Sequence, residues 1–169
     1  MDLNVLEDLK CSPYVIEHSE AVLKKALHIS SKSDANMDLD LDLVKSGAIL
    51  HDVGRSRTAG IRHAVVGALI LKQHGYPRKI IKITEKHIGA GISKEEAVLM
   101  GLPAKDYLPT SLEEKIVAHA DNLIHGTREV SLDFVIRKWE KKMGNDHPSL
   151  DRLRKLHQEL LGYCSVSEF

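Results

Sequence analysis

The spacing of apolar residues predicts helices along almost the whole chain. Ser12 and Pro13 are typical of a helix start, because a serine hydroxyl can accept from free backbone N–H groups and proline fixes the backbone angle of the first turn. Apolar residues with helical spacing follow from Val15 to Ile29, and His18 falls on the same stripe. We therefore expect a long helix here, with a histidine on its apolar face.

Four later segments repeat this arrangement. Each is a stripe of apolar residues, three or four positions apart, in which one position holds an ionisable side chain. The stripes are Leu41-Val44-Ala48-His51, which we expect to end at Gly54; His63-Val66-Ile70, ending at Gly75; Ile80-Ile83-His87, ending at Gly89; and Val117-Asp121-Ile124. Asp52 follows His51 directly, so two ionisable residues are adjacent in the first of these stripes.

Helix starts are also visible between and after these stripes. Ser93 with Glu96, and Ser111 with Glu114, have the spacing of a capping box, in which each side chain bonds the backbone N–H of the other residue. Two further amphipathic segments, at 132–139 and 150–160, are separated by a polar turn.

No segment keeps the alternating period of a strand. The sequence therefore predicts an all-α fold, a single compact helical bundle of about eight helices. We expect one domain over residues 1–169, with a motif-bearing core at 12–130 and amphipathic C-terminal helices at 131–161.

The amino-acid composition argues against some classes of binding partner. The 24 lysines and arginines balance 24 aspartates and glutamates, whereas a protein that binds extended nucleic acid would carry an excess of positive charge. The two cysteines, Cys11 and Cys164, form no disulfide framework, and the longest uncharged apolar run, residues 64–71, is far too short to span a bilayer. The N-terminus has no basic start before an apolar stretch. We expect a reduced, cytoplasmic protein that binds neither membrane nor extended nucleic acid.

The ionisable residues on apolar stripes predict a shared ligand. A single histidine of this kind is more often a hydrogen-bonded core residue than a ligand, but burying a polar side chain without a partner costs about 1–3 kcal/mol. Several such residues on separate helices therefore favour one site that satisfies all of them. Helical bundles build metal sites from inward-facing histidines and carboxylates, so a metal ion is the expected ligand.

The order of these residues resembles a known family. His18, His51-Asp52 and Asp121 are similar to the H...HD...D signature of the HD superfamily of metal-dependent phosphohydrolases, and HDVGR at 51–55 resembles its HDIG variant. The resemblance covers residues 14–125. It implies an HD-type helical bundle in which one ion is held by His18, His51 and Asp121, a second by His63 and His87, and both by Asp52, the expected catalytic residue.

Two departures from the family pattern affect this expectation. The second site of the dinuclear members often uses a His-His doublet, whereas His87 is followed by Ile88, so we expect the second ion to bind more weakly. Arg55 stands where a lysine is common; it keeps the positive charge and can grip phosphate oxygens through two N–H groups.

The expected ligand set also suggests the chemistry. Imidazole with carboxylate suits Mn, Fe, Co, Ni or Zn better than Mg or Ca, so we expect one or two divalent transition metal ions. Such ions activate water, which predicts hydrolysis of a phosphomonoester, phosphodiester or pyrophosphate bond. The expected partner is a small phosphorylated substrate, with a nucleotide favoured. Two alternatives stay open: a di-iron oxygenase on the same scaffold, and a non-catalytic module that binds a nucleotide or partner.

Candidate substrate-binding residues lie next to the expected ligands. Arg55 and Arg62 are in the basic segment before His63, and His125 comes four residues after Asp121, which would place it on the same helix face. Trp139 is expected in the core or at a subunit contact rather than under a base. The helices at 131–161 are a candidate surface for a homodimer.

Overall fold

The chain folds into helices joined by short loops, which confirms the predicted all-α class. The structure is a computed structural model that describes residues 3–34, 36–164 and 169. Its elements are α1 (Asn4–Asp8), α2 (Pro13–Lys32), α3 (Leu41–Leu50), the 3-10 helix η1 (Val53–Ser56), α4 (His63–Gln73), α5 (Arg78–Lys86), α6 (Lys94–Leu99), α7 (Leu112–Asn122), the strands β1 (Ile124–His125) and β2 (Arg128–Glu129), α8 (Leu132–Met143) and α9 (Pro148–Gly162). None of these helices has the length and apolarity needed to cross a membrane.

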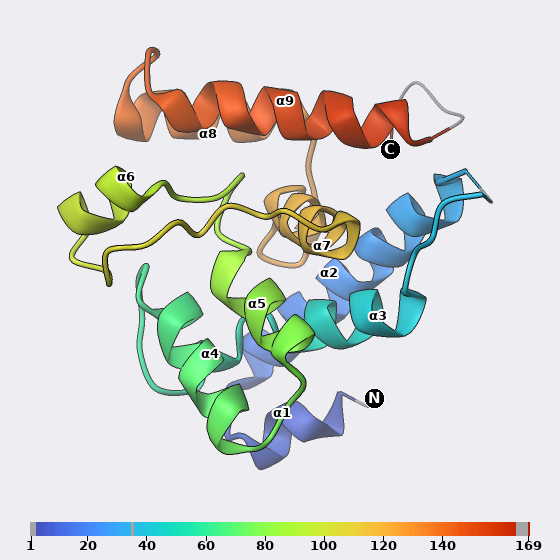
Figure 1. Ribbon diagram of the computed structural model, residues 1–169, viewed down its shortest axis with the longest axis vertical. Helices are drawn as coiled ribbons and strands as arrows, with labels where there is room; N and C mark the ends of the chain where they lie inside the picture. The colour runs from blue at the N-terminus through green and yellow to red at the C-terminus, as the bar shows by residue number, and fades with distance from the viewer. Residues whose placement is uncertain (1–2, 35, 165–168) are drawn as a thin grey trace.

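The helices surround α7. In Figure 1, α8 and α9 run across the top of the view, α7 lies beneath them, and α2 to α5 form the lower part. Buried side chains of α2, α3, α7, α8 and α9 belong to one apolar cluster, with Val22, Val44, Ile116, Val135 and Leu153 among its members. Because α7 packs between the two groups of helices, a residue on α7 can reach side chains from both.

The predicted helix starts are confirmed. The Ser12 hydroxyl accepts from the N–H of Val15, and Pro13 is the first residue of α2. Both capping boxes form, Ser93 with Glu96 at the start of α6 and Ser111 with Glu114 at the start of α7. These starts depend on hydrogen bonds between residues three positions apart, which explains why the sequence alone identifies them.

Several helices end earlier than their apolar stripes predict. α3 ends at Leu50 and α5 at Lys86, so His51 and His87 are the residues that follow each helix. α7 ends at Asn122, and the next residues form a two-stranded hairpin with Gly126 at a positive φ in its turn. His125 therefore lies on β1, and the expectation that it shares a helix face with Asp121 is wrong.

Gly54 lets the backbone of η1 approach α4 very closely. A Cβ at this position would lie 1.9 Å from the carbonyl oxygen of His63 and 2.6 Å from the amide nitrogen of Gly67. Both of those atoms are backbone, so they cannot rotate away as the end of a side chain could. Gly54 thus fixes the distance between Asp52 and the start of α4, where His63 lies.

An ion pair joins the helices that lead to His87 and Asp121. Lys86 Nζ lies 2.8 Å from Glu114 Oε2, and both side chains are almost wholly buried. The same carboxylate oxygen accepts from the backbone N–H and the hydroxyl of Thr110. Burial alone would raise the pKa of Glu114, but Lys86 and Thr110 outweigh it and hold the pKa below its ordinary value.

This ion pair predicts how stability depends on pH. A carboxyl whose pKa is lower in the folded state stabilises the protein above its unfolded pKa, near 4.5, and that contribution is lost as the pH falls through the folded pKa. Glu114→Gln removes the charge, so we expect a melting temperature about 2–8 °C lower at neutral pH. The variant should also lose less stability than the wild type on acidification. Thermal melts at pH 7 and pH 4, with the exposed Glu17→Gln as control, check this; parallel curves would contradict it.

Candidate metal centre

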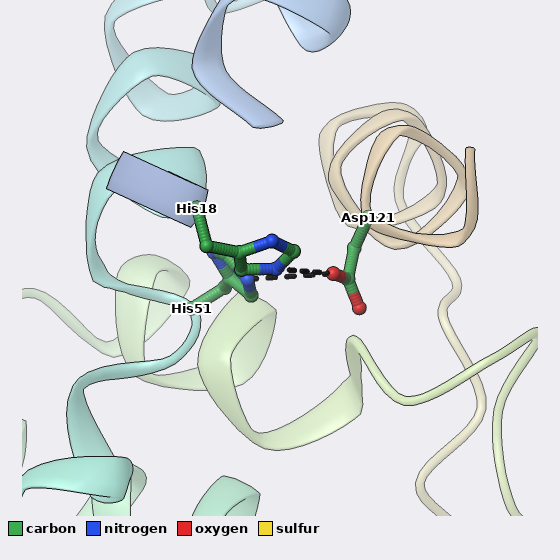
Figure 2. A group of neighbouring side chains, drawn as sticks. All are labelled: His18, His51 and Asp121. Atoms are coloured by element: carbon green, nitrogen blue, oxygen red, sulfur yellow. Dashed lines mark hydrogen bonds and ion pairs between the residues drawn. The ribbon is translucent and has the colours of Figure 1, made fainter. Parts of the chain in front are cut away.

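Side chains from five separate segments converge beside α7. Figure 2 shows His18 from α2 and His51 from the end of α3 facing Asp121 from α7. Asp121 Oδ1 lies 3.0 Å from His18 Nε2 and 3.5 Å from His51 Nε2. These three residues form one group whose ligand atoms are close enough together to hold a metal ion.

Asp52 lies between this group and two further histidines. Its Oδ1 is 2.9 Å from His63 Nε2 and 3.5 Å from His87 Nε2, while its Oδ2 is 3.8 Å from the Nε2 atoms of both His18 and His51. One carboxylate oxygen therefore faces each pair of imidazoles. His51, Asp52 and His87 form a second group that could hold an ion.

All four histidines donate their Nδ1 proton to a backbone carbonyl. His51 bonds Ala48, His63 bonds Gly60 and His87 bonds Thr84, each three residues earlier, at 2.5 to 2.7 Å. For His51 and His87 the acceptors are carbonyls of the last helical turn, which have no partner within the helix. His18 instead bonds the Gly126 carbonyl in the hairpin turn, at 2.6 Å. Since a carbonyl can only accept, each ring carries a proton on Nδ1, and in its neutral form it turns an Nε2 lone pair toward the carboxylates.

This arrangement brings hydrogen-bond acceptors, the Nε2 atoms of neutral histidines and the carboxylate oxygens, close to one another with no donor between them. His63 Nε2 and His87 Nε2 lie 3.0 Å apart, and the fully buried His51 Nε2 has no hydrogen-bond partner. Lone pairs and carboxylate oxygens at such distances repel each other unless a proton or a cation lies among them. The six side chains therefore fit a metal ion, and fixing of the ligand rings by carbonyls is the usual support of histidine metal sites.

The electrostatics of the site favour a positive charge at its centre. Burial alone would raise the pKa of Asp52 and of Asp121, but the neighbouring imidazoles hold both pKa values far below the ordinary range. Burial would likewise lower the pKa of His51, yet Asp52 and Asp121 raise it to about 9. Both carboxylates therefore stay ionised, and His51 holds either a second proton or a metal ion beside them. Burial instead lowers the pKa of His87.

The three predicted substrate-binding residues lie in different surroundings. Arg55 borders the cavity above the metal centre, and its Nε donates to Asp52 Oδ2 at 2.6 Å. His125 also borders the cavity, where Lys138 Nζ lies 3.1 Å from its Nδ1. The guanidinium of Arg62 instead donates to the carbonyl of Gly101, and Arg62 is not among the residues that line the cavity. The structure thus brings Arg55 and His125 to the site, but not Arg62.

The cavity has a wall that sequence reasoning missed. About 610 Å³ in volume, it extends from the candidate metal ligands to α8, where Phe134, Lys138, Trp139 and Lys142 line it. The sequence predicts an amphipathic segment with Trp139 in the core or at a subunit contact, and it gives no sign that the partly exposed face of this segment lines a cavity at the candidate metal centre. The Gly126 carbonyl was also missed, because its contact with His18 joins residues 108 positions apart.

The chain is similar in sequence to several known proteins. The sequence model of the HD domain matches residues 15–125, well over half of the chain. An uncharacterized protein of Methanocaldococcus jannaschii is 52% identical over 159 residues, which cover 94% of each chain. The tRNA (cytidine(56)-2'-O)-methyltransferase of Thermoplasma volcanium is 45% identical over 94% of this chain, which spans only 45% of that protein.

A solved structure agrees in fold. The HD domain of the L. monocytogenes phosphodiesterase PgpH, in complex with cyclic-di-AMP, aligns over 99% of both chains with a TM-score of 0.55 and 18% identity. The match to the HD sequence model includes all six residues of the candidate metal centre, His18, His51, Asp52, His63, His87 and Asp121. The chain belongs to the HD domain family.

Proposed function

We propose that this protein is a metal-dependent phosphohydrolase whose centre is formed by His18, His51, Asp52, His63, His87 and Asp121. The observation that carries the proposal is the set of four Nε2 lone pairs around two ionised carboxylates, with every Nδ1 proton already donated to a carbonyl. Divalent ions bound there would polarise a phosphate group and activate water for hydrolysis. The donor set suits Mn, Fe, Co, Ni or Zn.

The chain's own residues have separate roles in this proposal. Asp52 contacts both pairs of histidines, His18 with His51 and His63 with His87. It is therefore assigned as the ligand common to two ions and as the catalytic residue. Arg55 donates one N–H to Asp52 and keeps four on its terminal nitrogens, which suit two oxygens of one phosphate. His125 and Lys138 border the substrate side of the cavity.

The size and charge of the cavity favour a small phosphorylated substrate, and a nucleotide above others. A volume of about 610 Å³ lies within the range of small-ligand sites, about 300 to 1,000 Å³. Arg55, Lys138 and Lys142 add positive charge next to the centre. The zero net charge of the chain argues against an extended polynucleotide.

Metal reconstitution tests the proposed reaction. Chelated protein is reloaded under anaerobic conditions with Mn, Fe, Co, Ni or Zn. Phosphate release is measured from AMP, ribose 5-phosphate and pyrophosphate, and p-nitrophenol release from bis-p-nitrophenyl phosphate. Turnover of at least one compound with one of the metals is expected. Oxygen uptake by the iron form without phosphate release would instead indicate the di-iron oxygenase, and nucleotide binding without turnover in any metal would indicate the regulatory module.

Replacing His87, a member of the second group with His51 and Asp52, is expected to remove one ion only. In His87→Ala the imidazole facing Asp52 Oδ1 is lost, while the contacts of Asp121 with His18 and His51 persist. Elemental analysis at saturating metal should therefore give one equivalent less than the wild type. His74→Ala, which changes an exposed histidine after α4, should keep the full content. A wild type that saturates at one ion would contradict the second site and leave the first.

A further inference from the structure

The cavity connects the metal centre to an aromatic and basic face of α8. Six residues of this helix line the cavity, and we call the four aromatic and basic ones the α8 wall: Phe134, Lys138, Trp139 and Lys142. The opposite end of the same cavity is formed by His18, Asp52, His63, His87 and Asp121. A ligand with its phosphate at the candidate metal centre therefore has the α8 wall within the same cavity.

Trp139 is held in place by the loop that follows His87. A Cβ on Gly89 would lie 2.3 Å from Trp139 Cη2 and 2.9 Å from Cζ3, so the outer edge of the indole presses directly on the glycine backbone. Gly89 has a φ of +58°, and its carbonyl accepts from the side chain of Asn122, the neighbour of Asp121. The edge of the indole thus packs against the backbone of Gly89, which lies two residues after the candidate ligand His87.

Phe134 is placed by the hairpin that follows Asp121. Its ring centroid is 5.4 Å from that of His125, and Lys138 one turn later lies beside the same imidazole. The Phe134 side chain nevertheless stays 43% exposed. An aromatic ring left exposed at a cavity next to lysines is typical of a surface that stacks on a flat ligand bearing negative charge.

We propose that the α8 wall binds the base of a nucleotide, with Trp139 and Phe134 contacting the ring and Lys138 and Lys142 attracting the anionic ligand. This inference rests on the proposed function, because it places the phosphate of the same nucleotide at the metal centre. Trp139 packs against the apolar core, as the sequence predicts, and in this proposal it is also a specificity-determining residue. The α8 wall distinguishes a nucleotide from a sugar phosphate that lacks a base.

Tryptophan fluorescence tests this directly, because Trp139 is the only tryptophan in the chain. The purified protein is excited at the red edge of indole absorption and titrated with AMP or with ribose 5-phosphate, and emission is read on mixing, before turnover. We expect AMP to quench the emission and ribose 5-phosphate at equal concentration to leave it unchanged. An equal response to both compounds, or no response to AMP, overturns the proposal.

Matched variants separate base binding from a structural role. Trp139→Leu should raise the KM for AMP about tenfold while the KM for ribose 5-phosphate stays constant, and Trp139→Phe should keep most of the preference. Equal loss with both substrates would mean that Trp139 only supports the fold. Phe134→Leu, at a position that is 43% exposed, should weaken the quench by AMP with Trp139 intact. An unchanged titration counts against the proposal.

Different results would overturn the proposed hydrolase activity and the proposed base-binding site on the α8 wall. Quenching by AMP without turnover of any phosphate compound would keep the base subsite and overturn the hydrolase. Turnover with no preference between AMP and ribose 5-phosphate would keep the hydrolase and overturn the base subsite.

Discussion

Asp52→Asn is expected to reduce phosphate release by about a thousandfold or more and to lower the metal content. The two oxygens of Asp52 face different pairs of imidazoles, Oδ1 toward His63 and His87 and Oδ2 toward His18 and His51. Asparagine keeps the size of the side chain but removes its negative charge. Its amide NH2, a poor metal ligand, would face one of the two pairs of imidazoles. Elemental analysis and phosphate release on the same preparation measure both effects.

Asp38→Asn provides a control of matched chemistry, since Asp38 is exposed, lies before α3 and is not one of the candidate ligands. It should retain wild-type activity and metal content. If Asp52→Asn also retained both, Asp52 would not be the common ligand, and the dinuclear arrangement would have to be abandoned.

Gly54→Ala is expected to lower the melting temperature by about 6–12 °C, the equivalent of roughly 3 kcal/mol in a chain of this size. The new methyl group would meet the His63 carbonyl and the Gly67 amide at distances no real Cβ shows. Relief requires η1 and α4 to separate, which moves His63 away from Asp52. Calorimetry should therefore show the drop in stability, and elemental analysis a loss of metal.

Gly162→Ala is the natural comparison, because a Cβ at Gly162 meets nothing within 4 Å and α9 has ordinary helical geometry there. That variant should melt at or slightly above the wild-type temperature. A similar melting temperature for both variants would show that the close approach of η1 to α4 is not needed for stability.

Local sequence signals accounted for much of the fold and of the candidate ligands. The capping boxes at Ser93 and Ser111 act within one helical turn, so the residues alone specify them. The ligand candidates can be identified in the sequence because each is an ionisable residue in an otherwise apolar stripe. Burying such a side chain without a partner costs free energy, so the pattern indicates a shared partner. Their convergence around Asp52 follows from that pattern and from the helical bundle.

Features that depend on distant contacts could not be predicted in this way. The end of α7 at Asn122, and with it the position of His125, is set by a hairpin turn whose carbonyl bonds His18 across 108 residues. Trp139 has the apolar neighbours of a core residue, and only the packing of α8 over the Gly89 loop turns it toward the cavity. Arg62 is basic and close in sequence to His63, but the loop geometry directs it to Gly101.

The contact between His18 and Asp121 joins positions 103 residues apart, with the other candidate ligands between them. An ion held there would fasten α2 to α7 as a cross-link does, and its binding free energy would add to the free energy of folding. Preparations that differ in metal loading should consequently differ in heat resistance, so melting curves measured on otherwise identical samples would have to be compared at known occupancy.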